Sequence, residues 1–153
     1  MIISQMKEYR NPIPTVDAII QKSSFLLVIK RQNDPYKDTF ALPGGFVDEG
    51  ETVEEALIRE VFEETSLEIH PIEILGVYSN PKRDPRGHMI TVVFITIMHG
   101  GEPNAGDDAK ELHWIPLDNI NNIDFAFDHK LIIKDYINWR NSGGTFWSTK
   151  ARS

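Results

Sequence analysis

The sequence contains no cysteine. That absence excludes a disulfide framework and cysteine-ligated zinc, and it fits a reducing compartment. The sequence also lacks any apolar run approaching the ~18 residues that a membrane-spanning helix requires, and its N-terminal residues lack the apolar core of a signal peptide. We therefore expect a cytoplasmic protein with no membrane partner.

Basic residues are also in short supply. The 16 Lys and Arg stand against 23 Asp and Glu, for a net charge of −7. A general nucleic-acid binder usually carries a basic face, so we expect no nucleic-acid partner. The 153 residues, 41% of them hydrophobic, suffice for a single domain over residues 1–153. The tail 141–153 is glycine-containing and polar, and we expect it to be mobile or to lie against a partner.

What the sequence does contain is an acidic cluster, Glu60, Glu63 and Glu64, behind the glycine turn Leu42–Gly45. The i, i+3, i+4 spacing places the three carboxylates on one helical face, where like charges repel. Their hard oxygen ligands suit Mg²⁺ or Mn²⁺, and magnesium held by carboxylates favours phosphate chemistry. Taken alone, the same cluster is also compatible with a solvated charged helix face.

The stretch from residue 45 to residue 67 resembles the box of the Nudix hydrolase family, G-x5-E-x7-R-E-U-x-E-E-x-G-U, in which U is aliphatic. Ser66 stands where the family has glycine, at the point where a left-handed residue commonly ends a helix. Serine adopts that conformation at a cost of roughly 1 kcal/mol. Eight of the nine defined positions match: Gly45, Glu51, Arg59, Glu60, Val61, Glu63, Glu64 and Leu67.

The resemblance implies hydrolysis of a phosphoanhydride bond, with Arg59, Glu63 and Glu64 as catalytic residues. It also implies a metal site made by the carbonyl of Gly44 together with Glu60, Glu63 and Glu64. Because Glu63 follows Arg59 at i+4, the arginine can hold carboxylates in place. We expect Glu51 to pair with Arg59 or to join the metal shell.

The remaining pattern predicts a mixed sheet between helices. A capping-box spacing predicts a helix from Thr52 to Thr65, and apolar periodicity predicts a second helix from His129 to Arg140. Together these elements indicate an α/β fold, the α/β/α sandwich with a mixed β-sheet that the Nudix resemblance also implies. The predicted strands are β-rich runs at 15–21, 24–30, 72–78, 90–98 and 111–117.

A proline-stiffened loop, residues 79–88, carries the substrate prediction. It gathers Arg83, Arg86 and His88 in an otherwise acidic protein, and an arginine fork matches phosphate oxygens. The loop resembles that of ADP-ribose pyrophosphatases, as do residues 11–17 and 126–129, and this implies hydrolysis of ADP-ribose to AMP and ribose 5-phosphate. Phe127 could stack on adenine, although core packing is an equal alternative for it, and a plain basic turn is the alternative for the loop.

A general base is needed to deprotonate water. The candidates are a box glutamate or a carboxylate of the loop 106–111, namely Asp107, Asp108 or Glu111. By resemblance to family enzymes that use a loop glutamate after the box, Glu111 is the specific hypothesis.

Three functions stay open. The first is a magnesium-dependent ADP-ribose pyrophosphatase or a related nucleoside diphosphate sugar hydrolase. The second is a Nudix enzyme for nucleoside triphosphates or dinucleoside polyphosphates. The third is a ligand-sensing module without catalysis, like the Nudix-related regulators. Each takes a small nucleotide as its partner, and a homodimer that uses Phe146 and Trp147 as contacts is compatible with all three.

Overall fold

The computed structural model describes residues 10–106 and 109–152. Within these residues a mixed sheet of eight strands is flanked by two α-helices, α1 (Val53–Thr65) and α2 (His129–Ser142), and a short 3-10 helix spans Leu117–Asn122. The strands are β1 (Ile13–Lys22), β2 (Phe25–Arg31), β3 (Phe40–Ala41), β4 (Gly44–Phe46), β5 (Glu68–Tyr78), β6 (Met89–Gly100), β7 (Ala109–Pro116) and β8 (Phe146–Trp147).

The strand order is β3-β2-β1-β6-β5-β8, with β4 paired to β1 and β7 paired to β2. β1 and β6 run parallel, from Ile13 opposite Met89 to Ile20 opposite Thr96, whereas β5 and β6 are antiparallel. Most residues of β6 are apolar or β-branched, as a strand covered on both faces requires. The predicted mixed sheet is confirmed.

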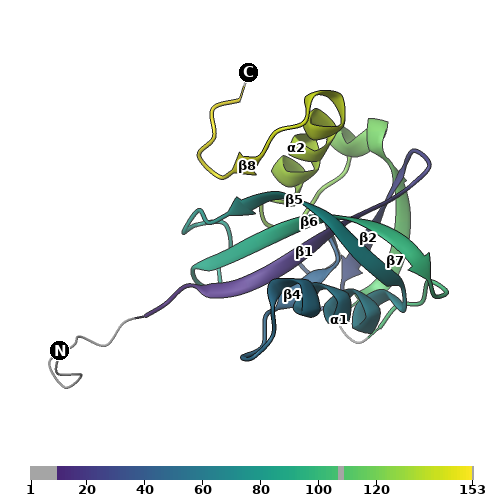
Figure 1. Cartoon of the computed structure of the whole chain (residues 1–153), viewed down its shortest axis with the longest axis horizontal. Coiled ribbons are helices and arrows are strands. Elements are labelled where there is room, and N and C mark those ends of the chain that lie inside the picture. Colours follow the sequence, from purple (N-terminus) through teal and green to yellow (C-terminus); the bar gives the residue numbers. More distant parts are fainter. Residues whose placement is uncertain (1–9, 107–108, 153) are drawn as a thin grey trace, which may run out of the picture.

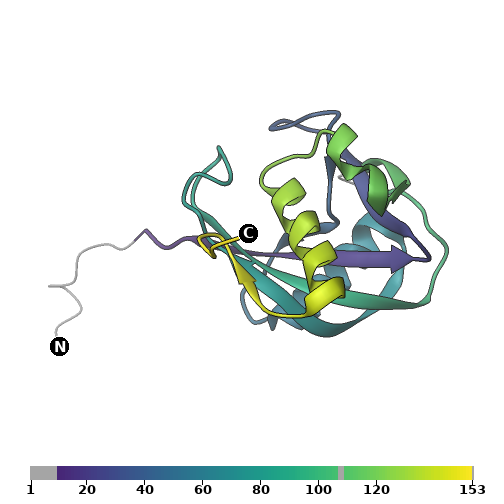
Figure 2. The same cartoon turned by 90° about the horizontal axis from the view of Figure 1, so that it is seen from above.

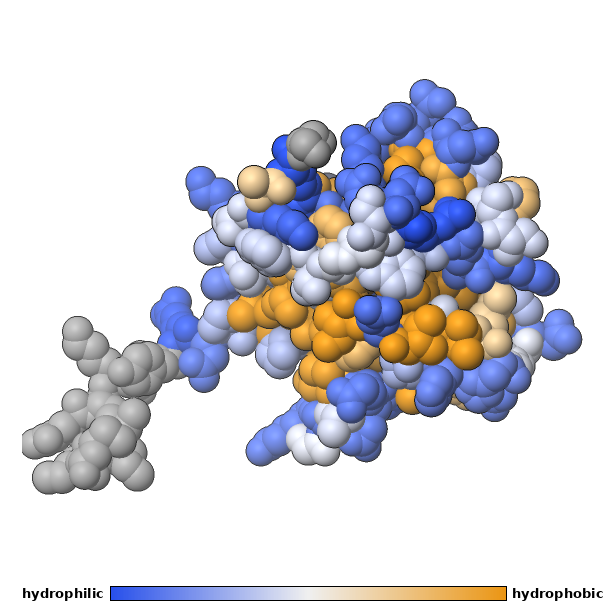
Figure 3. Space-filling model, turned by 45° about the horizontal axis from the view of Figure 1, so that its top comes forward, coloured by the Kyte–Doolittle hydropathy of each residue, from blue (hydrophilic) through white to orange (hydrophobic). Residues whose placement is uncertain are grey.

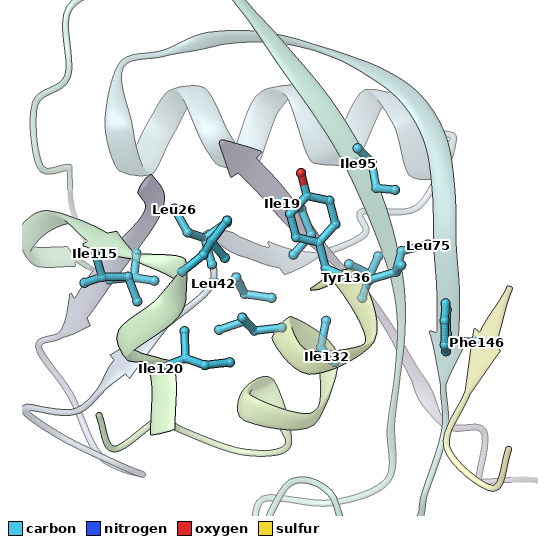
Figure 4. Close-up of a cluster of buried hydrophobic side chains, with 14 of the residues drawn as sticks. Ile19, Leu26, Leu42, Leu75, Ile95, Ile115, Ile120, Ile132, Tyr136 and Phe146 are labelled. Carbon is cyan, nitrogen blue, oxygen red and sulfur yellow. The ribbon is translucent and has the colours of Figure 1, made fainter. Parts of the chain in front are cut away.

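The two helices cover opposite faces of the sheet (Figures 1 and 2). On the α1 face, Leu57 and Val61 pack into one buried cluster with residues of β1, β2, β5 and β6. On the α2 face, Ile132 and Tyr136 pack with residues such as Ile19 in a second cluster (Figure 4). Each helix therefore buries its apolar side on the sheet, and the sandwich of three layers follows.

The ends of α1 form as the sequence predicts. The hydroxyl of Thr52 accepts a hydrogen bond from the N–H of Glu55, and the Glu55 carboxylate accepts one from the N–H of Thr52. Ser66 ends the helix in the left-handed conformation, with φ of 63°. Ser66 thus ends the helix in the conformation expected of the glycine that it replaces, so the departure from the box is tolerated.

In the C-terminal tail the structure contains secondary structure that the sequence did not predict. α2 runs on to Ser142, and Phe146–Trp147 then pairs in parallel with Gly76 and Val77 of β5. A strand of two residues has no periodic pattern, so the sequence carried no signal for it. Within the part of the chain that the structure describes, no helix is long and apolar enough to cross a membrane.

Candidate active site

Arg59 is the centre of an ionic network on α1. Its guanidinium donates to Glu51 from Nε (2.7 Å) and from Nη2 (2.8 Å). Nη1 donates to Glu60 (2.9 Å) and to Glu63 (3.3 Å), and Nη2 donates to the carbonyl of Phe46 (3.0 Å). The hydrogen bonds from Arg59 lower the pKa of Glu51 to about 2. The predicted pairing with Glu51 is confirmed, and Arg59 holds three of the box glutamates in place: Glu51, Glu60 and Glu63.

Glu64 lies directly beneath the glycine turn. Its side chain is buried, and its Oε1 accepts a hydrogen bond of 2.9 Å from the N–H of Gly44. A Cβ on Gly45 would lie 2.3 Å from Oε2 of Glu60, and one on Gly44 would lie 2.0 Å from the carbonyl oxygen of Val16. At Gly44 the obstacle is backbone, so only glycine fits there. At Gly45 the obstacle is the end of the Glu60 side chain, which a larger residue would push out of its place beside the turn.

A cavity of about 300 Å³ opens at this junction. Its walls come from segments far apart in the sequence: β1, the glycine turn, α1, the loop between β5 and β6, and the residues that precede α2. Box carboxylates and loop arginines therefore line one cavity. Among the lining residues are Asp17, Arg31, Glu60, Glu64, Arg83, Arg86, Phe127 and His129.

Both arginines of the loop line the cavity, and each is held by a carboxylate. Arg83 is almost completely buried, and its Nε and Nη2 donate to Asp128 at 2.9 and 2.6 Å. Arg86 is more exposed, and its Nε and Nη2 donate to Asp84 at 3.1 and 2.7 Å. These two-point bonds orient the planar guanidinium groups and bring positive charge to a wall of the cavity.

The aromatic ring of Phe127 lies close to two of the three arginines that line the cavity. The guanidinium of Arg31 lies 5.0 Å from the ring centroid of Phe127, and that of Arg86 lies 5.5 Å from it. Arg86 also lies 5.6 Å from the ring of Phe46. Tyr36 meets Phe127 edge to face at 5.0 Å. Phe127 is half-buried and lines the cavity, so its ring is part of the site.

Asp17 and His129 form a buried polar pair in the cavity wall. The hydroxyl of Thr91 donates to Oδ2 of Asp17 at 2.5 Å, and Nε2 of His129 lies 3.8 Å from Oδ1. Burial raises the pKa of Asp17 to about 7 and lowers the pKa of His129 to about 3. Nδ1 of His129 accepts from the N–H of Leu42 (2.9 Å), so the neutral ring carries its proton on Nε2.

Asp17 and His129 were not among the sequence-predicted site residues. A signal for Asp17 was present, because it is a charged residue in the middle of the apolar run of β1 and charged residues are rarely buried without a partner. His129 lies in the segment 126–129 that resembles ADP-ribose pyrophosphatases, but its position at the start of α2 favoured the interpretation as a plain helix residue. Thr91, which fixes the carboxyl of Asp17, is 74 residues away along the chain.

The structure does not bring every predicted residue to this cavity. Glu63 points outward, with half of its side chain exposed. Glu111 lies on β7, where its carboxylate is 2.6 Å from Nε2 of His113, and His88 contacts the carbonyl of Ser79 at 2.8 Å. Glu63, Glu111 and His88 are absent from the cavity lining. Arg59 is absent from it as well, and it is linked to the cavity through its hydrogen bonds to two lining residues, Glu60 and Phe46. The other two loop carboxylates considered as a base, Asp107 and Asp108, lie outside the described residues.

The chemistry of the donor set fits a magnesium or manganese ion. Across the described ranges 10–106 and 109–152, no three His, Cys, Asp or Glu side chains form a ready-made metal cage. Mg²⁺ does not need one, since it usually keeps several waters and is held by one or two carboxylates together with substrate phosphates. Glu60 and Glu64 line the same cavity one helical turn apart, and they meet that requirement.

The fold and site define the class of protein. Residues 11–136 match the NUDIX domain, and the chain belongs to this family. A Methanocaldococcus jannaschii protein called ADP-ribose pyrophosphatase is 55% identical over 139 residues, which are 89% of this chain and 81% of that protein.

Two solved structures have the same fold. The NUDIX domain of Shewanella oneidensis NrtR, complexed with ADP ribose, superposes with a TM-score of 0.77 at 27% identity and covers 89% of this chain and 94% of that one. A bifunctional NMN adenylyltransferase/ADP ribose pyrophosphatase from Francisella tularensis, complexed with AMP and a manganese ion, gives a TM-score of 0.74 at 32% identity. That match covers 90% of this chain and 44% of the F. tularensis chain.

Proposed function

We propose that this protein hydrolyses the pyrophosphate bond of ADP-ribose, with a bound divalent cation, to yield AMP and ribose 5-phosphate. The observation that carries the proposal is the single cavity in which the box carboxylates Glu60 and Glu64 face Arg83, Arg86 and Phe127. The similarity to a protein called ADP-ribose pyrophosphatase supports the choice of substrate.

The helix wall of the cavity would carry the chemistry. Glu60 and Glu64 would hold Mg²⁺ or Mn²⁺, with Gly44 and Glu63 as further proposed ligands. The metal would neutralise phosphate charge and lower the pKa of a bound water. Arg59 positions Glu60 through its 2.9 Å hydrogen bond, and the N–H of Gly44 positions Glu64. The buried state of Glu64 strengthens its electrostatic effect.

The opposite wall would recognise the nucleotide. Arg83 and Arg86 supply positive charge for the diphosphate in a protein whose net charge is −7. Phe127 offers a ring face for the adenine base. The guanidinium of Arg86 lies near the rings of both Phe46 and Phe127. A planar base that enters this part of the cavity would therefore have to displace this guanidinium or stack beside it.

Glu111 stays a hypothesis for the general base, and the geometry gives it no support. Its carboxylate pairs with His113 outside the cavity lining. Glu64 is better placed, because it lines the cavity and is buried within it. A candidate base must come within hydrogen-bond reach of the proton that it abstracts. We therefore favour a box glutamate.

A substrate panel tests the function directly. Purified protein is incubated with ADP-ribose, nucleotide sugars, ATP and a dinucleoside polyphosphate, each with Mg²⁺ or with Mn²⁺, and the products are separated by chromatography. We expect AMP and ribose 5-phosphate from ADP-ribose at the highest kcat/KM. Preferred release of pyrophosphate from ATP would identify a nucleoside triphosphate hydrolase instead. Tight binding of ADP-ribose without turnover would identify a ligand-sensing module.

A homodimer and a cytoplasmic location are further parts of the proposal. Phe146 is buried in the core, so of the two predicted contact residues only Trp147 is available to a partner. Apolar side chains gather across the middle of one face of the molecule (Figure 3). A second copy of the chain could cover the exposed apolar residues of β5, β6 and β8, and sedimentation velocity would decide between monomer and dimer. These residues are Ile72, Ile74, Val77, Ile97 and Trp147.

A further inference from the structure

We infer that the C-terminal segment 146–152 is a clasp that positions the loop 79–88 for substrate recognition, and that Ser148 is its key positioning residue. The inference rests on the proposed function, since it names what holds the arginine wall of the same site. Figures 1 and 2 both show the end of the chain passing beside the base of this loop.

Ser148 is the direct link between clasp and loop. Its Oγ accepts hydrogen bonds from the N–H of Ser79 (2.9 Å) and from the N–H of Asn80 (3.1 Å). These are the first two residues after β5, so one hydroxyl sets the direction in which the loop leaves the strand. The other end of the loop returns to the same place, where Nε2 of His88 contacts the carbonyl of Ser79 at 2.8 Å.

Arg152 anchors the clasp to the core. Its guanidinium makes two hydrogen bonds of 2.7 Å to Asp135, a fully buried residue of α2. It also donates to the carbonyls of Trp147 and Lys150, each at 2.9 Å, and so ties the segment into a compact turn. Asp135 accepts a further hydrogen bond from the hydroxyl of Tyr78 (2.7 Å). A buried carboxylate requires such partners, so Asp135 keeps Arg152 in place.

The same anchor reaches the strand that leads into the loop. Tyr78 is the last residue of β5 and immediately precedes Ser79. Two residues earlier, Gly76 pairs with Phe146, and a Cβ on Gly76 would lie 2.2 Å from the carbonyl oxygen of Phe146. Glycine is therefore what allows the C-terminal strand to approach β5. Phe146 itself is buried in the core cluster of the α2 face.

The loop thus held carries Arg83, Asp84 and Arg86 into the cavity lining. Ser148 does not line the cavity, so it can act on substrate only through the loop. Loss of its hydroxyl should weaken recognition and leave the metal-binding wall on α1 intact. The expected signature is a KM for ADP-ribose raised about three- to tenfold in Ser148→Ala, with kcat within twofold of wild type.

Two measurements test the inference on the whole 153-residue chain. The first is hydrogen exchange of peptides that cover residues 79–88 and 53–65, in wild type and in Ser148→Ala. Backbone amides that lose a hydrogen-bond acceptor open more often, so exchange at residues 79 and 80 should accelerate severalfold while the α1 peptide is unchanged. The second is steady-state kinetics on ADP-ribose. Ser148→Thr, which keeps a hydroxyl, should restore both values, and the exposed neighbour variant Thr149→Ala is the matched control.

Unchanged exchange in the loop would overturn the inference, as would faster exchange with an unchanged KM. An equal loss of kcat in Ser148→Ala and Thr149→Ala would also overturn it, because it would indicate a general effect of changing the tail. The proposed function fails separately, if wild type yields no AMP from ADP-ribose. In that case the exchange measurement still decides whether the segment clasps the loop, since it needs no substrate.

Discussion

The cavity has two walls that are built in different ways. The helix wall, made by α1 and the glycine turn, is assembled mostly by neighbours in sequence, such as the pairs from Arg59 to Glu60 and to Glu63. The loop wall is assembled across long distances. Arg83 pairs with Asp128, 45 residues away, and Ser79 is held by Ser148, 69 residues away.

This difference suggests a division of labour. In the proposed function, the helix wall would present carboxylates to a cation, a requirement shared by any phosphoanhydride substrate. The loop wall would present arginines and an aromatic ring, and their arrangement would decide which substrate fits. A change on the helix wall should therefore reduce kcat for every substrate. A change on the loop wall should alter the preference among substrates.

The largest effect is expected from Glu64→Gln on the helix wall. The substitution removes the charge from a buried carboxylate, while the amide oxygen can still accept the hydrogen bond from Gly44. Loss of one preorganised electrostatic contact, such as an oxyanion-hole donor, typically costs about 10²–10³-fold in kcat, and we expect a loss of at least this order here. Steady-state assays with ADP-ribose and ATP at saturating Mg²⁺ should show this loss for both substrates.

The matched control is Glu54→Gln, which removes an exposed carboxylate from the first turn of the same helix. It should retain wild-type kcat. Circular dichroism should show that both variants are folded. If Glu64→Gln turned over at the wild-type rate, the helix wall would not be the catalytic wall.

Arg83→Ala should give the next largest effect, on the stability of the loop wall. Its side chain is nearly buried, and its removal leaves Asp128 without its two-point partner. The free energy of unfolding should fall by roughly 2–3 kcal/mol. Urea denaturation of Arg83→Ala, Asp128→Asn and the double variant measures this loss. Additive losses in the double variant would mean that the two residues are not coupled.

A smaller effect is expected on the pH dependence of the unfolding free energy, to which Asp17 and His129 should contribute with opposite signs. In His129 the folded pKa is lowered to about 3, so its contribution to stability is present above pH 6.5 and is lost as the pH falls toward 3. In Asp17 the folded pKa is raised to about 7, so its contribution is present below pH 3.8 and is lost as the pH rises toward 7. Between about pH 4 and 6.5 the two slopes oppose each other.

Asp17→Asn should therefore remove the contribution of Asp17 and leave the pH dependence of stability that His129 causes. The unfolding free energy of this variant should rise with pH from 4 to 6.5, more steeply than that of wild type by up to about 1.4 kcal/mol per pH unit. Urea denaturation at half-unit pH steps measures the two profiles. Parallel profiles would show that burial does not shift these two groups in opposite directions.

The contrast between the walls also explains what the sequence could reveal. Helical spacing is local, so the face shared by Glu60 and Glu64 and the capping box at Thr52 could be read directly. The cavity places Asp17 beside His129, 112 positions later, and only the parallel pairing of β1 with β6 brings Thr91 to the same carboxyl. Neither helical nor strand periodicity in a single sequence predicts such a long-range contact.

The tail illustrates the same limit. Its glycines and polar residues favoured either mobility or contact with a partner, whereas the structure shows Arg152 paired with a buried aspartate of the chain itself. The signal was the one acidic residue of α2, Asp135, whose need for a cationic partner became visible only when its burial was known.

The most direct test of the division between the walls is the discrimination ratio of Arg86→Ala. This ratio is kcat/KM for ADP-ribose divided by kcat/KM for ATP, measured at saturating Mg²⁺ in the variant and in wild type. We predict that this ratio falls about tenfold in the variant, which corresponds to a loss of roughly 1.4 kcal/mol of transition-state stabilisation for ADP-ribose. The fall should come from a higher KM for ADP-ribose, with kcat retained. An unchanged ratio, with both substrates affected equally, would contradict the assignment of substrate choice to the loop wall.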